Sequence, residues 1–199
     1  MFEKFFKKKK DNNIDFKKQL EVLGKLGISL NPEVTVHNLL KEMKFSNFVS
    51  NDYLSLLIVM GCEFQNSDNI WIKFSNNIWY LDTECIEDNG DYIRVAERLI
   101  AMANGELKIN NLNDYIDIEN KEAKVYFELN EKLYNWELVV DDDWLDMNIF
   151  SKFNDLLSEL NSHKKFYVSA IDQSILVGIF NKIQLNEINK LIDVEFEFM

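Results

Sequence analysis

Two kinds of hydrophobic spacing alternate in blocks along this chain, and their order constrains the fold more than any other feature. Some segments repeat apolar residues every three or four positions, as on one face of a helix, and others repeat them at every second position, as in a half-buried strand. In the clearest strand pair, Val125, Phe127 and Leu129 alternate with polar residues, and the alternation resumes at Tyr134 after a turn at 130–132. This order predicts an α+β fold with a largely antiparallel sheet of hairpins packed by helices, rather than parallel βαβ units.

The first third of the chain is predicted to be helical. Apolar residues at helical spacing predict a helix over 14–26 and a second one capped by Thr35. A third helix would follow a cap at Ser50 or Asn51 and end at Gly61. Its run from 54 to 60 is apolar on all sides, which predicts burial.

The remaining elements alternate between hairpins and helices. The strongest helical pattern opens at Gly90 and Asp91 and stops at Gly105, and Asp146 is positioned to cap another helix. The further predicted elements are hairpins of 69–74 with 78–82 and of 165–171 with 174–180, a helix over 184–192 and a final strand over 194–198.

The chain has no segment that looks like a linker between domains. Its 199 residues include six glycines and one proline, and 47% of them are hydrophobic, which is enough to form a core without disulfides. We therefore expect a single α+β domain over 14–199, helical over 14–62 and built of a sheet plus helices over 69–199. Residues 1–13 are expected to form a basic, flexible terminus.

Charge is unevenly distributed along the sequence. Five lysines against Glu3 give the first ten residues a charge of +4, so the rest of the chain carries −16 within the total of −12. A field of this sign repels phosphate backbones and attracts basic proteins, so nucleic-acid binding is not expected. The alternative is that the acidic surface only maintains solubility.

The start of the chain bears on localisation. The lysine run follows the apolar residues Phe2, Phe5 and Phe6, the reverse of the order in a secretory signal. The longest apolar stretch, 53–62, has about half the ~20 residues of a membrane helix. We expect a cytoplasmic protein, with membrane contact only through the phenylalanines and lysines of the tip.

Familiar catalytic and cofactor motifs are missing from the sequence. Cys62 and Cys85 are not in a CxxC pair, and His37 and His163 lie near no serine or cysteine of a nucleophile motif. We interpret His37 as a residue at the edge of the core and His163 as a surface residue. No glycine-rich phosphate loop occurs. The sequence thus predicts no catalytic residue, no metal ligand and no cofactor.

Two acidic segments, each between a predicted strand and a helix start, are the candidate site. They contain the residues that we expect to bind a partner, namely Trp79, Tyr80, Asp82, Glu84, Glu87, Asp88, Asp141, Asp142, Asp143 and Trp144. Aromatic anchors within a charged rim are typical of a protein-binding surface. In the structural interpretation, Asp88 and Asp91 only stabilise a helix N-terminus while Glu84 and Glu87 face water.

Three segments resemble uncharacterised bacterial proteins of the kind found beside polymorphic toxins. They read WYLDTECIEDNGDYIRVAERL at 79–99, WELVVDDDWLD at 136–146 and KKFYVSAIDQSILVGIF at 164–180, and the similarity covers roughly 50–199. Immunity proteins of that kind are small, acidic and cytoplasmic and bind a toxin domain directly. The resemblance implies such a role here and assigns no toxin contact to any residue.

These observations leave two hypotheses of different classes. The first is a non-enzymatic acidic binding protein, which the resemblance specifies as an immunity protein that neutralises a basic toxin domain. The alternative is a divalent-metal-dependent hydrolase that uses Asp82, Glu84, Asp88 and Asp143, since clustered carboxylates hold Mg²⁺ or Ca²⁺. If the two acidic segments lie together in the fold, they form a single anionic surface that could serve either function.

Overall fold

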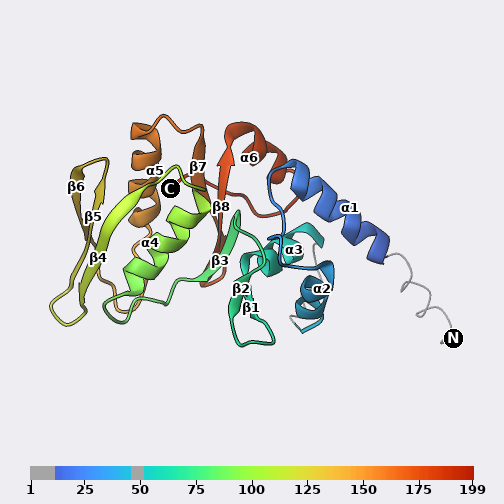
Figure 1. Ribbon diagram of the computed structural model, residues 1–199, viewed down its shortest axis with the longest axis horizontal. Helices are drawn as coiled ribbons and strands as arrows, with labels where there is room; N and C mark the ends of the chain where they lie inside the picture. Colours follow the sequence, from blue (N-terminus) through green and yellow to red (C-terminus); the bar gives the residue numbers. More distant parts are fainter. Residues whose placement is uncertain (1–11, 46–51) are drawn as a thin grey trace.

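The computed structural model describes residues 12–45 and 52–199 (Figure 1). Within these ranges it contains six helices and eight strands in three antiparallel sheets, which confirms the predicted α+β class. The helices are α1 (Asn12–Lys25), α2 (Val36–Phe45), α3 (Asp52–Gly61), α4 (Asp91–Met102), α5 (Asn148–Glu159) and α6 (Lys182–Ile188). The strands are β1 (Glu63–Gln65), β2 (Trp71–Lys73), β3 (Ile78–Asp82), β4 (Ile109–Asp117), β5 (Glu122–Leu129), β6 (Lys132–Leu138), β7 (Lys164–Ile171) and β8 (Ser174–Asn181).

The sheet β3-β8-β7 lies in the middle of the molecule, and both of its faces are covered (Figure 1). Side chains alternate along β8, so that Ile175 and Val177 join one hydrophobic core while Leu176 and Phe180 join another. Seven of the eight residues of β8 are buried, which explains why its sequence is apolar almost throughout. The sheet therefore separates two cores that share its strands.

The first core lies between this sheet and the sheet β4-β5-β6, with α4 and α5 in the same layer (Figure 1). Phe153 of α5 joins the two sheets, because its ring packs edge-to-face on Trp136 of β6 and on Phe166 of β7. The ring centroids are 5.3 Å and 6.3 Å apart, respectively. Edge-to-face packing at these distances is favourable for aromatic rings. The outer face of β4-β5-β6 carries the exposed residues Tyr115 and Tyr126.

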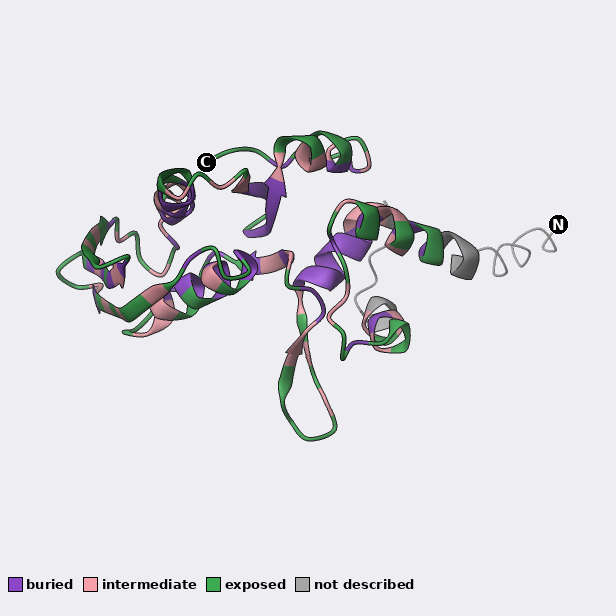
Figure 2. Ribbon diagram, turned by 45° about the horizontal axis from the view of Figure 1, so that its top comes forward, coloured by how far each residue is buried: buried purple, intermediate pink, exposed green. Residues whose placement is uncertain are grey.

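The second core is formed by the N-terminal helices and α6 on the other face of the central sheet. Helix α3 packs closely on β3, since a Cβ atom added at Gly61 would lie 2.5 Å from the backbone nitrogen of Tyr80. Leu56 and Leu57 of this helix are fully buried, as the apolar run predicts. The hairpin β1-β2 projects from this half of the molecule and is largely exposed (Figure 2).

The outer edge of β7 is covered rather than free. Asn154 of α5 donates to the Phe166 carbonyl at 2.9 Å and accepts from the Phe166 N–H at 2.7 Å. Two residues further on, Val168 pairs with Glu197 in an isolated bridge. The edge of the central sheet thus has backbone partners, which blocks pairing with another chain at these positions.

Several predicted elements are confirmed. Hairpins β5-β6 and β7-β8 form at the predicted positions, with positive φ at Asn130, Glu131 and Asp172 in their turns. Thr35 caps α2, since its hydroxyl accepts from the Asn38 N–H at 3.2 Å. Helix α4 begins and ends within three residues of the predicted positions.

Other predictions are wrong. Residues 75–77 do not turn a hairpin, because β2 pairs with β1 and β3 pairs with β8. The segment 194–198 makes only the bridge at Glu197 instead of a strand. Strand β4 was not predicted, because its sequence INNLNDYID is rich in Asn and Asp, which are depleted in strands.

Some sequence predictions fall outside the described residues. These are the basic terminus up to residue 11, including the membrane-contact alternative at Phe2, Phe5 and Phe6, and the caps proposed at Ser50 and Asn51. Helix α1 begins at Asn12, close to the predicted start at 14. In the two described ranges, no helix has the length and apolar character needed to cross a membrane.

Candidate functional site

The two acidic segments lie against each other. The Asp143 carbonyl accepts a hydrogen bond from the backbone N–H of Cys85 at 2.9 Å, and Trp144 pairs with Glu84 in an antiparallel bridge. A further hydrogen bond of 2.8 Å runs from the Leu145 N–H to the Thr83 carbonyl. We call these segments, residues 82–91 and 141–146, the joined acidic loops.

Most of the predicted partner-binding residues are exposed on the joined acidic loops. Asp143 is half-buried, and the Trp144 side chain is 39% exposed. The exposed carboxylates are Asp82, Glu84, Glu87, Asp88, Asp141 and Asp142. Across residues 12–45 and 52–199, no lysine, arginine or histidine forms an ion pair with any of these six or with Asp143.

Trp79 and Tyr80, the other two predicted residues, are placed differently. They are consecutive on β3, so their side chains point to opposite faces of the sheet and pack against different cores. Both are half-buried and line a cleft beside the loops. Trp144 is therefore the aromatic residue that the joined acidic loops themselves expose.

The first loop is held by carboxylates that accept backbone hydrogen bonds. Asp91 accepts from the N–H groups of Glu87 and Asp88, at 2.8 and 2.9 Å. Asp114, which comes from β4, accepts from Gly90 at 2.8 Å and from Ile93 at 3.2 Å, and so it caps the N-terminus of α4. Asp91 is the first residue of α4, but its carboxylate holds the preceding loop. The helix N-terminus is instead capped by Asp114, which the sequence does not predict because the contact spans more than twenty residues.

The acidic loops do not converge on a point that would hold a metal ion. Among the described residues, no group of three or more His, Cys, Asp or Glu side chains is arranged as a possible metal site. One oxygen of Asp82 instead accepts from the Glu84 N–H at 3.1 Å. The metal-dependent hydrolase therefore has no supporting arrangement in this part of the chain.

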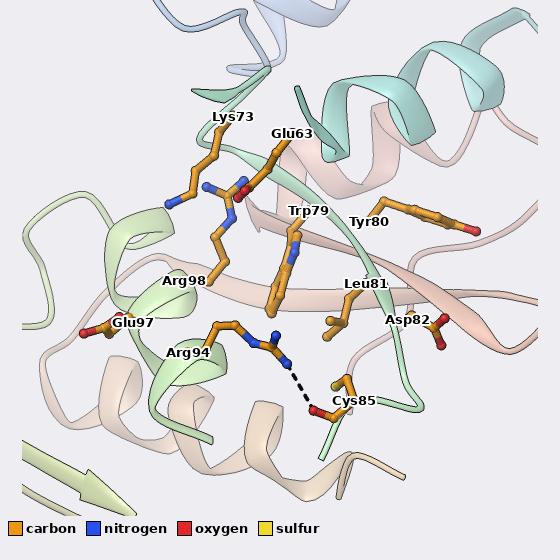
Figure 3. Close-up of a pocket in the computed structure, with 10 residues that line it drawn as sticks. All are labelled: Glu63, Lys73, Trp79, Tyr80, Leu81, Asp82, Cys85, Arg94, Glu97 and Arg98. Atoms are coloured by element: carbon orange, nitrogen blue, oxygen red, sulfur yellow. Dashed lines mark hydrogen bonds between the residues drawn. The ribbon is translucent and has the colours of Figure 1, made fainter. Parts of the chain in front are cut away.

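A cleft of about 390 Å³ lies next to the joined acidic loops (Figure 3). It is lined by residues of β1, β2, β3 and α4 together with the start of the first loop. The lining residues are Glu63, Lys73, Trp79, Tyr80, Leu81, Asp82, Cys85, Arg94, Glu97 and Arg98. Three cations and three carboxylates thus belong to the lining of a cleft that also has an apolar wall at Trp79 and Leu81, and the side chains of Asp82 and Glu97 point outward from it (Figure 3).

Arg98 is the buried charge of this cleft. The residue is 4% exposed, and its Nη2 atom donates to the carbonyls of Ser75 and Ile78, at 2.8 and 3.1 Å. Its Nε and Nη1 atoms are buried without a hydrogen-bond partner among the described residues. Burial lowers the pKa of Arg98 to about 10, and the Glu63 carboxylate opposes this shift, so the guanidinium remains charged at neutral pH.

Arg94, one turn earlier on α4, is already satisfied. Its guanidinium forms an ion pair with Asp91 at 3.2 Å and donates to the Cys85 carbonyl at 3.1 Å (Figure 3). The two arginines of the cleft therefore differ: Arg94 is exposed and paired, whereas Arg98 is buried and has donors that no described residue accepts from.

The cysteines and histidines do not add a reactive group. Burial raises the pKa of the Cys62 and Cys85 thiols to about 11, which disfavours the nucleophilic thiolate at neutral pH. His37 is exposed and not at the edge of the core as predicted, because α2 turns it toward solvent. His163 is exposed, in agreement with the prediction.

Arg98 was not singled out from the sequence, although one signal was present. It lies three residues after Val95 and four before Met102, both on the buried face of α4. A charged residue at that spacing borders the apolar stripe and must either snorkel to solvent or find partners. Sequence alone does not say which, because the burying elements β1 to β3 come from another part of the chain.

No protein-family model matches this chain, and neither curated proteins nor solved structures give a significant match.

Proposed function

We propose that this protein is a non-enzymatic binding protein that engages a basic protein partner through the joined acidic loops. The observation that carries the proposal is that two loops connected by backbone hydrogen bonds hold eight carboxylates that form no ion pair within residues 12–45 and 52–199. Adjacent like charges repel each other, so their concentration is unfavourable unless a partner compensates for it. A basic protein surface would supply that compensation.

Apolar groups at the same place favour a protein as the partner. The Trp144 side chain is 39% exposed, and Val139, just before the second loop, is 62% exposed. An exposed tryptophan within a charged rim is the arrangement in which a few apolar anchors supply affinity and the charges steer association.

The partner class that we propose is a toxin domain with a basic surface, which would make this chain an immunity protein. The support is the resemblance described above, together with the charge of −16 carried by residues 11–199. Binding by complementary charge requires no catalytic group on this chain. A cytoplasmic location belongs to the same proposal.

The test neutralises the second loop without changing its shape. The variant Asp141→Asn/Asp142→Asn/Asp143→Asn removes three charges, and asparagine tolerates the positive φ of 48° at residue 142. Wild type and variant are used as bait in a lysate of the native host, and the captured protein is then purified. We expect a basic protein whose association rate with the variant is about tenfold lower at low salt and depends less steeply on ionic strength.

The matched control removes the same number of charges elsewhere. Glu33→Gln/Glu106→Gln/Glu131→Gln changes three exposed carboxylates, one before α2, one after the C-terminal end of α4 and one in the β5-β6 turn, none of them next to the joined acidic loops in the sequence. It should leave the association rate within about twofold of the wild type. Equal effects of the two triple variants would contradict the proposed surface and indicate attraction by net charge alone.

A further inference from the structure

The unused donors of Arg98 need an explanation. A buried polar group without a partner lowers the stability of the fold, and more so when it is charged, so such groups are rare in folded proteins. Nη2 accounts for the contacts to Ser75 and Ile78, but Nε and Nη1 contact no acceptor among the described residues. The position of these donors at the wall of a cleft indicates that the acceptor comes from a ligand.

Two side chains of the projecting hairpin cover the end of the guanidinium. Glu63 of β1 and Lys73 of β2 are cross-strand partners, and both line the cleft beside Arg98 (Figure 3). Neither of them forms an ion pair within residues 12–45 and 52–199. Long unpaired side chains can rotate away without a change in the backbone, which opens a path to Nη1.

The lining of the cleft limits the charge of the ligand. Lys73, Arg94 and Arg98 attract an anion, while Glu63, Asp82 and Glu97 repel each additional negative charge. A single carboxylate therefore fits better than a phosphate, which carries more charge at neutral pH. The apolar wall at Trp79 suits an aromatic or aliphatic body, and a volume of about 390 Å³ is in the range of small-molecule sites.

We propose that this cleft binds a small organic acid, with its carboxylate on the free donors of Arg98 and its apolar body against Trp79. Glu63 then acts as an internal competitor, because its carboxylate lies beside the guanidinium in the free protein. This site lies beside the joined acidic loops and shares Asp82 and Cys85 with them, but it takes an anion, whereas the loops would take a basic protein.

The test follows the Nε–H of Arg98 directly. The full-length protein is titrated with sodium benzoate at constant ionic strength, and the arginine Nε–H signals are recorded by ¹H–¹⁵N NMR, with Arg98 assigned from the Arg98→Lys variant. We expect a saturable shift of the Arg98 signal. Benzyl alcohol, which lacks the carboxylate, should leave it unchanged.

Two variants separate binding from a structural role. Glu63→Gln removes an exposed competitor and should tighten benzoate binding roughly three- to tenfold, an effect that a merely structural Arg98 would not produce. Arg98→Lys should weaken it about tenfold or more, through loss of a charge-assisted hydrogen bond. Should Arg98→Lys fail to fold, Glu63→Gln still decides the question.

Two results would overturn the proposal. One is an Arg98 signal that does not move with benzoate in either the wild type or Glu63→Gln. The other is a shift with inorganic phosphate at lower concentration than with benzoate, which would exclude the organic-acid class.

Discussion

Gly61 and Gly24 differ in the space that surrounds them. At Gly61 a Cβ atom would lie 2.5 Å from the Tyr80 backbone nitrogen, whereas at Gly24, near the end of α1, nothing lies within 4 Å. We expect Gly61→Ala to lower the free energy of unfolding by about 1–3 kcal/mol, because α3 must move away from β3. Gly24→Ala should raise it by about 0.5 kcal/mol, since alanine favours the helix. Urea denaturation measures both, and equal effects would contradict the close packing of α3.

The thiols give a second prediction at the residue scale. With a pKa of about 11 in place of 9.0, each cysteine has about a hundredfold less thiolate at pH 8. Iodoacetamide should therefore modify Cys62 and Cys85 about a hundredfold more slowly in the folded protein than in urea, as followed by peptide mass spectrometry. A rapid reaction of Cys85 in the folded state would mean that the joined acidic loops open.

At the scale of elements, one side chain of α5 provides the hydrogen bonds for the outer edge of β7. Asn154 is 1% exposed and satisfies both backbone groups of Phe166. Asn154→Ala should destabilise the protein by about 2–4 kcal/mol, because it leaves a buried donor and a buried acceptor unpaired. Asp155→Ala, at the next and exposed position, should change stability by less than about 0.5 kcal/mol. Chemical denaturation of both variants checks this, and similar losses would contradict the role of Asn154.

The sequence predicts those elements whose signals are local. The alternation and turn residues of the hairpins β5-β6 and β7-β8 each lie within one short stretch of sequence. The apolar spacing of helix α4 is equally local. Strand β4 could not be predicted, because its polar sequence is ordered by pairing with β5. The failed hairpin at 75–77 has a similar cause, since the true partners β1 and β8 lie elsewhere in the chain.

The candidate sites divide in the same way. The acidic loops could be identified because their charge is visible in the sequence. The contact between them, through Asp143 and Cys85, could not be predicted from the sequence. The cleft could not be identified, because its walls come from four separate elements and the burial of Arg98 depends on all of them. Charge concentration is a local property, whereas an unsatisfied donor exists only in the folded chain.

At the scale of the whole molecule, the two cores share one sheet, so we expect them to unfold together. Leu57 lies in the core on the α3 side, and β5 lies in the other core. Leu57→Ala should lower stability by about 2–5 kcal/mol, and native-state hydrogen exchange should report the same loss at the slowest amides of β5. Wild-type protection in β5 would mean that the cores are independent and that 14–199 is not a single cooperative domain.

The position of β8 also determines when this protein can fold during synthesis. Both cores need side chains from residues 174–181, so neither can close until that strand has left the ribosome. The chain up to that point would expose the apolar faces of α3, α4 and α5 to the surrounding proteins. Folding of both cores thus waits for β8, and until then the nascent chain keeps these apolar faces uncovered.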